Sequence, residues 1–116
     1  MKKFLVLYQS EGALNGPSVS EMFARATPEQ LKAGLGVWRA WQENSGSAIV
    51  DLGTPLDHST TVTRDASSPS KTTITGYSVL QADSLKDALA LMKGHPHFFM
   101  PGASAQVLEC VPLPGM

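Results

Sequence analysis

The chain has 116 residues, a formal net charge of −1 and a single cysteine, Cys110. This length allows one domain, residues 1–116, that buries roughly two-thirds of the surface exposed by its unfolded chain. The balanced charge without a basic run argues against nucleic acid and anionic membrane as partners, and one cysteine excludes an internal disulfide and a cysteine-built zinc site, which fits a cytoplasmic location.

The first predicted element is a strand over residues 3–9. Lys2 and Lys3 followed by FLVLY imitate the opening of a signal peptide, but the apolar run is too short and ends at Gln9. No segment of the sequence is long enough to cross a bilayer. Because the run is apolar on both faces, we expect a central strand. Residues 10–26 predict a loop with a turn of helix at 19–24, either a plain connection or a lid.

A helix is predicted from Pro28 to about Ser45, before Gly46. Thr27 is a suitable N-cap, proline suits the first helical position, and Gln30 completes a capping box. The expected buried stripe consists of Leu31, Leu35, Trp38 and either Trp41 or Gln42. Two glycines, Gly34 and Gly36, each weaken a helix by roughly 1 kcal/mol relative to alanine. They either permit close packing on the sheet or are tolerated.

A second strand is predicted over residues 47–52, ended by Gly53 and Pro55. Residues 57–71 are polar, rich in serine and threonine, and long for a hairpin connection. Loops of this length in compact domains are functional or mobile. Residues 60–64 are able to pair as an extra strand.

Residues 73–98 carry the most consistent local signals in the chain. The β-branched and aromatic run over 73–82 predicts a strand, and Gly76 within it indicates a bulge or a close backbone approach. Ser84 is a good N-cap for a helix with one apolar face, which is formed by Leu85, Ala88, Leu89 and Met92. Gly94 suits the left-handed position after the helix, and the His95-Pro96 pair forbids its extension.

The remaining residues predict a Pro-Gly turn over 98–103 and a last strand over 105–111. Cys110 is expected there as a small buried apolar side chain. The prolines at 112 and 114 block further sheet pairing. The tail 111–116 is apolar and extended, so we expect it to dock on its own domain or on a partner.

The predicted order is therefore β-α-β-β-α-β, an α+β chain of the split βαβ, ferredoxin-like kind. This order predicts one antiparallel sheet with the first and third strands central and both helices on one face. Tyr8, Ile49 and Val79 are the kind of positions that then leave apolar surface bare. A homodimer, paired either face to face or edge to edge, is the simplest way to cover that surface.

Several stretches resemble the YCII-related family of small proteins, in the order in which that family has them. They are KFLVLY at 3–8, GYSV at 76–79, ADSL at 82–85, ALAL at 88–91, GHP at 94–96 and VLE at 107–109. The resemblance implies a ferredoxin-like subunit of a dimeric α/β barrel, with a pocket between sheet and helices and an enzymatic role that is generally unassigned. Two family features are missing here. No histidine precedes His58, so the family's His–Asp pair near the first helix is not carried over, and RDAS at 64–67 stands where one subgroup has Asp-Gly-Pro-Phe.

Two histidines are the first candidates for chemistry. His95 follows a helix, where an imidazole is able to titrate near neutral pH and act as acid or base. The alternative is that His95 binds helix-terminal carbonyls and that His97 lies on the surface. Their His-Pro-His spacing is not a reliable metal signature, so we expect no metal.

Asp51 ends the second strand and is a candidate to orient His95. Alternatively, it caps the turn at Gly53. Asp57-His58 in the long loop is expected to be solvated. Arg64 is a candidate to bind a ligand carboxylate, although an exposed loop arginine is the ordinary alternative.

Trp38, Trp41 and Tyr77 are candidates to line an aromatic pocket, whereas core packing is the alternative for Trp38. The chain has no phosphate loop, Rossmann turn or nucleophile elbow, so no cofactor is expected.

The first functional hypothesis is a cofactor-independent enzyme that transfers protons on a small organic molecule. In it, His95 and Asp51 are catalytic, and the substrate-binding residues are Tyr77, Trp38, Arg64 and His97. The alternatives are a non-catalytic module that binds a small molecule and a module that only interacts with a neighbour.

Overall fold

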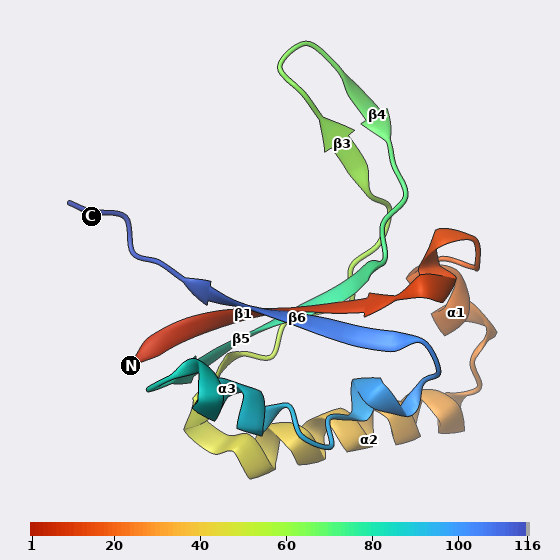
Figure 1. Ribbon diagram of the computed structural model, residues 1–116. Helices are drawn as coiled ribbons and strands as arrows, with labels where there is room; N and C mark the ends of the chain where they lie inside the picture. The colour runs from red at the N-terminus through yellow and green to blue at the C-terminus, as the bar shows by residue number, and fades with distance from the viewer. Residues whose placement is uncertain (116) are drawn as a thin grey trace.

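The chain forms a four-stranded antiparallel sheet whose helices lie on one side, while a thin hairpin stands away from the other side (Figure 1). The computed structural model describes residues 1–115, so Met116, the end of the predicted tail, lies outside the described residues. The predicted α+β class with an antiparallel sheet is confirmed. Between residues 1 and 115, no helix combines the length and apolar character that crossing a membrane requires.

The elements follow each other in an order close to the predicted one. They are β1 (Lys2–Ser10), η1 (Glu11–Leu14), α1 (Val19–Arg25), α2 (Pro28–Ser45), η2 (Gly46–Ala48), β2 (Ile49–Asp51), β3 (Thr60–Val62), β4 (Ser67–Pro69), β5 (Ile74–Ala82), α3 (Leu85–Leu91), η3 (Pro96–Phe99) and β6 (Ala103–Cys110), where η marks a 3-10 helix. The extra pairing expected near residues 60–64 is the two-stranded hairpin β3–β4.

The main sheet has the order β2-β5-β1-β6, with β1 and β5 in the two central places. Side chains alternate between the faces of a strand, and in β1 the side chains of Phe4, Val6 and Tyr8 point toward the helices and are buried. On β5 the same face carries Ser78 and Leu80, which are also buried. These residues form the floor of the core on which α2 and α3 pack.

The opposite side of the sheet, called the open face below, carries Leu5, Leu7, Tyr77, Val79 and Leu108. Leu5 stands between Val79 of β5 and Leu108 of β6, and Leu7 stands beside Tyr77. In Figure 1 no helix covers this side. It is therefore an apolar surface in contact with solvent.

The edge strand β6 corrects one prediction, because Cys110 is exposed and not buried. Cys110 pairs with Lys3, two positions from the Leu5–Leu108 pair. The alternation of the strand therefore places it on the open face, near the sheet's end.

The long helix α2 begins and ends where predicted, with both hydrogen bonds of the capping box formed between Thr27 and Gln30. Its predicted apolar stripe is only partly right. Trp41 is buried and Trp38 packs against the core, but Leu31 and Leu35 are 43% and 48% exposed. The indoles fill the space beneath the central strands, and the first turns of the stripe have no place in the core cluster.

The short helix α3 begins at the predicted N-cap, where the Ser84 side chain accepts a hydrogen bond from the Asp87 amide. Gly94 follows the helix with a φ of 71°, the left-handed conformation expected there. The indole N–H of Trp41 donates to the carbonyl of Leu91 at 2.9 Å. This bond satisfies a carbonyl at the C-terminal end of α3 and ties α3 to α2.

The second strand is shorter than the predicted range 47–52, because residues 46–48 form a 3-10 turn and a tight turn follows Asp51. Gly53 lies in that turn with a φ of 78°, and a Cβ atom built on it falls 1.7 Å from the carbonyl oxygen of Tyr77. Gly76 makes the close approach expected of it, since a Cβ there lies 3.3 Å from the carbonyl oxygen of Thr54. The strand register between β1 and β5 also shifts at this point.

Candidate functional site

His95 lies at the centre of a hydrogen-bonded cluster in the core. Its side chain is fully buried at the start of η3. The Nδ1 atom accepts the backbone N–H of His97 at 2.9 Å, and the Nε2 atom lies 3.1 Å from the hydroxyl oxygen of Tyr8. Both ring nitrogens are therefore engaged inside the protein.

These contacts determine the protonation of the cluster. Because Nδ1 accepts a hydrogen bond, the proton of the neutral imidazole sits on Nε2, which donates to Tyr8. The Tyr8 hydroxyl donates to Oγ of Ser78 at 2.9 Å, and Ser78 donates to the carbonyl of Leu52 at 2.6 Å. The result is a chain of three donors that ends at the backbone beside β2.

Aromatic rings enclose His95. The ring centroids of Trp41 and Trp38 lie 4.3 and 4.6 Å from that of His95, and the ring of Tyr8 lies at 5.0 Å. Burial, with a smaller contribution from the charge of His97, lowers the pKa of His95 to about 4. Burial also raises the pKa of Tyr8 to about 12, although its bond to Ser78 acts in the opposite direction. Both groups are thus neutral at physiological pH.

His97 is buried, which contradicts the alternative that it lies on the surface. Its Nε2 atom faces two backbone carbonyls, Gln9 at 3.0 Å and Ser104 at 2.9 Å. Since carbonyl oxygens only accept, this nitrogen carries a proton and is shared between the end of β1 and the start of β6. His97 thereby ties η3 to the end of the sheet.

Asp51 and Tyr77 lie together, but away from His95. Asp51 accepts the backbone N–H of Gly53 at 2.8 Å, the contact expected of a turn-capping aspartate, and the Tyr77 hydroxyl at 3.3 Å. Tyr77 stands on the open face, whereas its neighbour Ser78 points into the core. The carboxylate of Asp51 therefore does not contact the imidazole of His95.

Arg64 is exposed in the turn between β3 and β4. Figure 1 shows the turn that joins these two strands at the far end of the hairpin. Asp57 and His58, expected in a solvated loop, form an exposed pair at 3.3 Å. The Ser20 hydroxyl donates to Asp57 at 2.6 Å and, as the largest cause, lowers the pKa of that carboxyl. Of the six predicted site residues, the structure thus gathers His95, His97 and Trp38 in one place and leaves Arg64 apart.

Two members of the cluster, Tyr8 and Ser78, were not among the predicted site residues. The available signal was the alternation of the two central strands. Tyr8 shares the buried face of β1 with Val6, and Ser78 shares that of β5 with Leu80. A hydroxyl on an otherwise apolar face needs a buried partner, and these two strands are neighbours.

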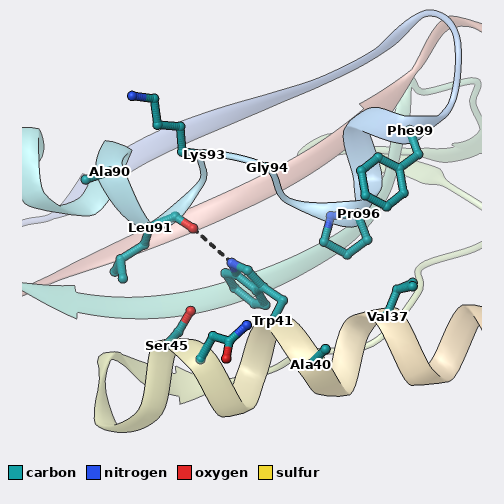
Figure 2. Close-up of a pocket in the computed structure, with 11 residues that line it drawn as sticks. Val37, Ala40, Trp41, Ser45, Ala90, Leu91, Lys93, Gly94, Pro96 and Phe99 are labelled. Atoms are coloured by element: carbon teal, nitrogen blue, oxygen red, sulfur yellow. Dashed lines mark hydrogen bonds between the residues drawn. The ribbon is translucent and has the colours of Figure 1, made fainter.

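Trp41, whose ring packs against His95, also borders a depression on the protein surface. This depression lies between α2 and residues 90–99 (Figure 2). Its volume is about 420 Å³. Val37 and Trp41 rise from α2, Pro96 and Phe99 face them from η3, and the Lys93 side chain stands at the upper rim. The depression does not reach the His95 ring nitrogens, which are already bonded to protein atoms.

Among residues 1–115, no three or more His, Cys, Asp and Glu side chains gather where they could hold a metal ion. In the same part of the chain, every buried side-chain nitrogen and oxygen has a hydrogen-bond partner. The cluster is thus closed and satisfied, and it presents no free group to a ligand. No protein-family model matches this chain, and no curated protein matches it with significant similarity.

Proposed function

We propose that this chain is a ferredoxin-like, YCII-related subunit that forms a homodimer and acts as a non-catalytic interaction module. The observation that carries the proposal is the uncovered apolar face of the sheet. The strand order supports the ferredoxin-like part, because β1 and β5 are central and both long-range crossovers place α2 and α3 on one side. The hairpin β3–β4 then counts as an insertion between the second and third strands of that arrangement.

The open face has the composition of a surface that is covered in the assembled protein. Its central row runs from Leu108 through Leu5 to Val79, and Leu7 and Tyr77 form the next row. Leu108 is 43% exposed. Contiguous apolar patches of this kind mark interaction sites more often than they are left in water.

The accessible area supports the proposal of a contact with a second subunit. A compact monomer of 12.3 kDa exposes roughly 6,100 Å², whereas this chain exposes 8160 Å². The radius of gyration, 15.7 Å, likewise exceeds the value of about 13 Å expected for this length. The excess of about 2,000 Å² is of the order that each partner buries in an obligate homodimer.

The state of His95 favours this proposal over acid–base catalysis. A general acid or base must come within hydrogen-bond reach of a reacting group. His95 is fully buried, and both of its nitrogens are bonded to protein atoms. Its role is better explained as a neutral cross-link between β1 and η3, and the catalytic assignment with Asp51 stays a prediction.

Sedimentation velocity over a range of concentrations tests the homodimer. Leu108→Lys introduces a charge into the open face, and we expect it to shift the protein to monomer. Leu89→Lys is the matched control, because this α3 leucine is 50% exposed on the helical side. The proposal is wrong if the wild-type protein sediments as a monomer at every concentration, or if both variants behave alike.

A second candidate function is the binding of a small organic molecule in the depression between α2 and η3. Its volume of about 420 Å³ falls in the range of ligand pockets, 300 to 1,000 Å³. The apolar walls of Trp41, Pro96 and Phe99 suit a flat apolar group, and Lys93 at the rim suits a negative one.

A thermal-shift screen of metabolites tests this second function. Binding at a hundredfold excess over Kd stabilises the folded state by about 2.7 kcal/mol. Val37→Arg fills the depression from a residue that is 42% exposed, so the fold should tolerate it. A compound that stabilises wild type and Val37→Arg equally does not bind there.

A further inference from the structure

We infer that residues 59–70 form an arm that clasps the second copy of this chain, a step that rests on the homodimer proposed above. This hairpin arm consists of β3, β4 and the turn between them. Its hydrogen bonds are internal, from Ser70 N–H to Ser59 C=O at 3.0 Å and from Thr63 N–H to Ala66 C=O at 2.7 Å. The hydroxyls of Ser59 and Ser70 also bond each other at 2.7 Å.

The arm lacks support from its own subunit. All six strand residues of β3 and β4 are exposed, and the Val62 side chain is 73% exposed. A two-stranded hairpin without further packing is only marginally stable in water. A surface from outside the chain is therefore needed to hold it in this well-formed conformation.

The direction of the arm indicates which partner covers the open face. In Figure 1 it rises on the side of the sheet opposite α2 and α3, which is the side of the open face. Two sheets that pack face to face lie about 10 Å apart. The arm extends about 16 Å over the five residue-to-residue steps from Ser59 to Arg64, so it passes beyond the plane of a sheet packed on the open face.

A second copy of this chain fits these conditions better than an unrelated partner. In a two-fold dimer the same patch serves both subunits, so each arm flanks the sheet of the other. The two arms then bury their exposed strands and Val62 together with the open faces. The surface of the two arms accounts for part of the excess accessible area, which is about 2,000 Å² per chain.

Removal of the arm tests the inference. Ser59 and Ser70 already form a cross-strand pair, so Asn-Gly in place of residues 60–69 closes a two-residue hairpin at that point. Sedimentation should show a Kd for dimerisation raised at least about tenfold, with an unchanged far-ultraviolet circular dichroism spectrum for the sheet and helices. A smaller change, Val62→Ser, should raise Kd severalfold, whereas Phe99→Ser, which is 70% exposed on the helical side, should leave it unchanged.

The outcomes separate the arm from the dimer. A wild-type protein that is always monomeric overturns both proposals. A wild-type dimer whose Kd is the same in the shortened variant and in Val62→Ser overturns only the arm. If the shortened variant fails to fold, Val62→Ser decides, together with hydrogen exchange at Thr61 and Val62. Those amides should be protected in the dimer and exchange freely on dilution to monomer, and equal exchange in both states contradicts the inference.

Discussion

The Nε2 atom of His95 lies 3.1 Å from the hydroxyl oxygen of Tyr8, and both side chains are closed off from solvent. Burial moves their pKa values apart, to about 4 for the imidazole and about 12 for the phenol. The pair is therefore uncharged over nearly the whole range in which proteins are stable. It joins the central strand β1 to the segment after α3 as a neutral cross-link.

This pair predicts a loss of stability in acid. An unfolded histidine titrates near pH 6.5, whereas folded His95 titrates near 4. Because the folded pKa is lower, the unfolded chain binds more protons between these values, and stability falls as the pH falls through that window. The contribution of His95 is complete above pH 6.5, and about 3 kcal/mol of it is lost by pH 4.

Urea unfolding of wild type and His95→Gln at pH 7.5 and pH 4 measures this effect. The wild-type protein should lose about 3 kcal/mol more than the variant over this interval. His58→Ala is the control, because His58 is an exposed imidazole whose side chain is 78% accessible. A wild-type pH dependence equal to that of His95→Gln contradicts a buried neutral histidine.

Tyr8→Phe tests the bond itself. The change removes only a hydroxyl, but it leaves the Nε2–H of His95 without an acceptor in the core. A buried donor without a partner costs about 1 to 3 kcal/mol, so the free energy of unfolding should fall by that amount. Ser78 keeps its bond to the carbonyl of Leu52 and adds little to the loss.

Tyr77→Phe is the matched control for this measurement. It removes the same hydroxyl from the neighbouring strand, where the bond to Asp51 is exposed and 3.3 Å long. Its effect on stability should stay within about 0.5 kcal/mol. Equal losses in Tyr8→Phe and Tyr77→Phe would show that the core cluster contributes no special stability.

Much of the fold was predictable because its signals are local. The capping box at Thr27 and Gln30, the N-cap at Ser84 and the left-handed Gly94 each depend on a few adjacent residues, and all three occur as predicted. The central position of β1 followed from its two apolar faces. The stripe on α2 was less predictable, because periodicity shows which residues share a face but not how far the sheet extends beneath them.

The site was predicted less well because its geometry is not local. His95, His97 and Trp38 do meet, but Tyr8 joins them across 87 residues of sequence. No spacing in the chain predicts that contact, which depends on where the start of η3 lies against β1 in the folded chain. Asp51 failed to meet His95 because β2 ends in a turn that uses the carboxylate for capping.

Two glycines of α2 offer a way to stabilise the protein. A Cβ atom built on Gly34 or Gly36 has nothing within 4 Å, so neither glycine serves close packing on the sheet. Alanine at either position should stabilise the helix by about 1 kcal/mol. Chemical unfolding of Gly34→Ala, Gly36→Ala and the double variant measures this gain. Destabilisation by either single change would mean that the helix packs against something at that position.

Gly53 should respond in the opposite way. Its φ is 78°, and a Cβ atom there falls 1.7 Å from the carbonyl oxygen of Tyr77. Gly53→Ala therefore forces the turn after β2 away from β5, and we expect a loss of at least about 2 kcal/mol on unfolding.

Gly102→Ala separates the two causes of that loss. Gly102 has a φ of 74°, but a Cβ on it meets nothing within 4 Å. This variant carries only the strain of the left-handed conformation, about 1 kcal/mol. The difference in unfolding free energy between the two variants measures how tightly the turn at Gly53 packs against Tyr77.

Since the same turn presents the Leu52 carbonyl to Ser78, Gly53→Ala should also weaken the hydrogen-bond chain that begins at His95. Amide exchange in η3 should therefore rise in Gly53→Ala and stay at the wild-type rate in Gly102→Ala.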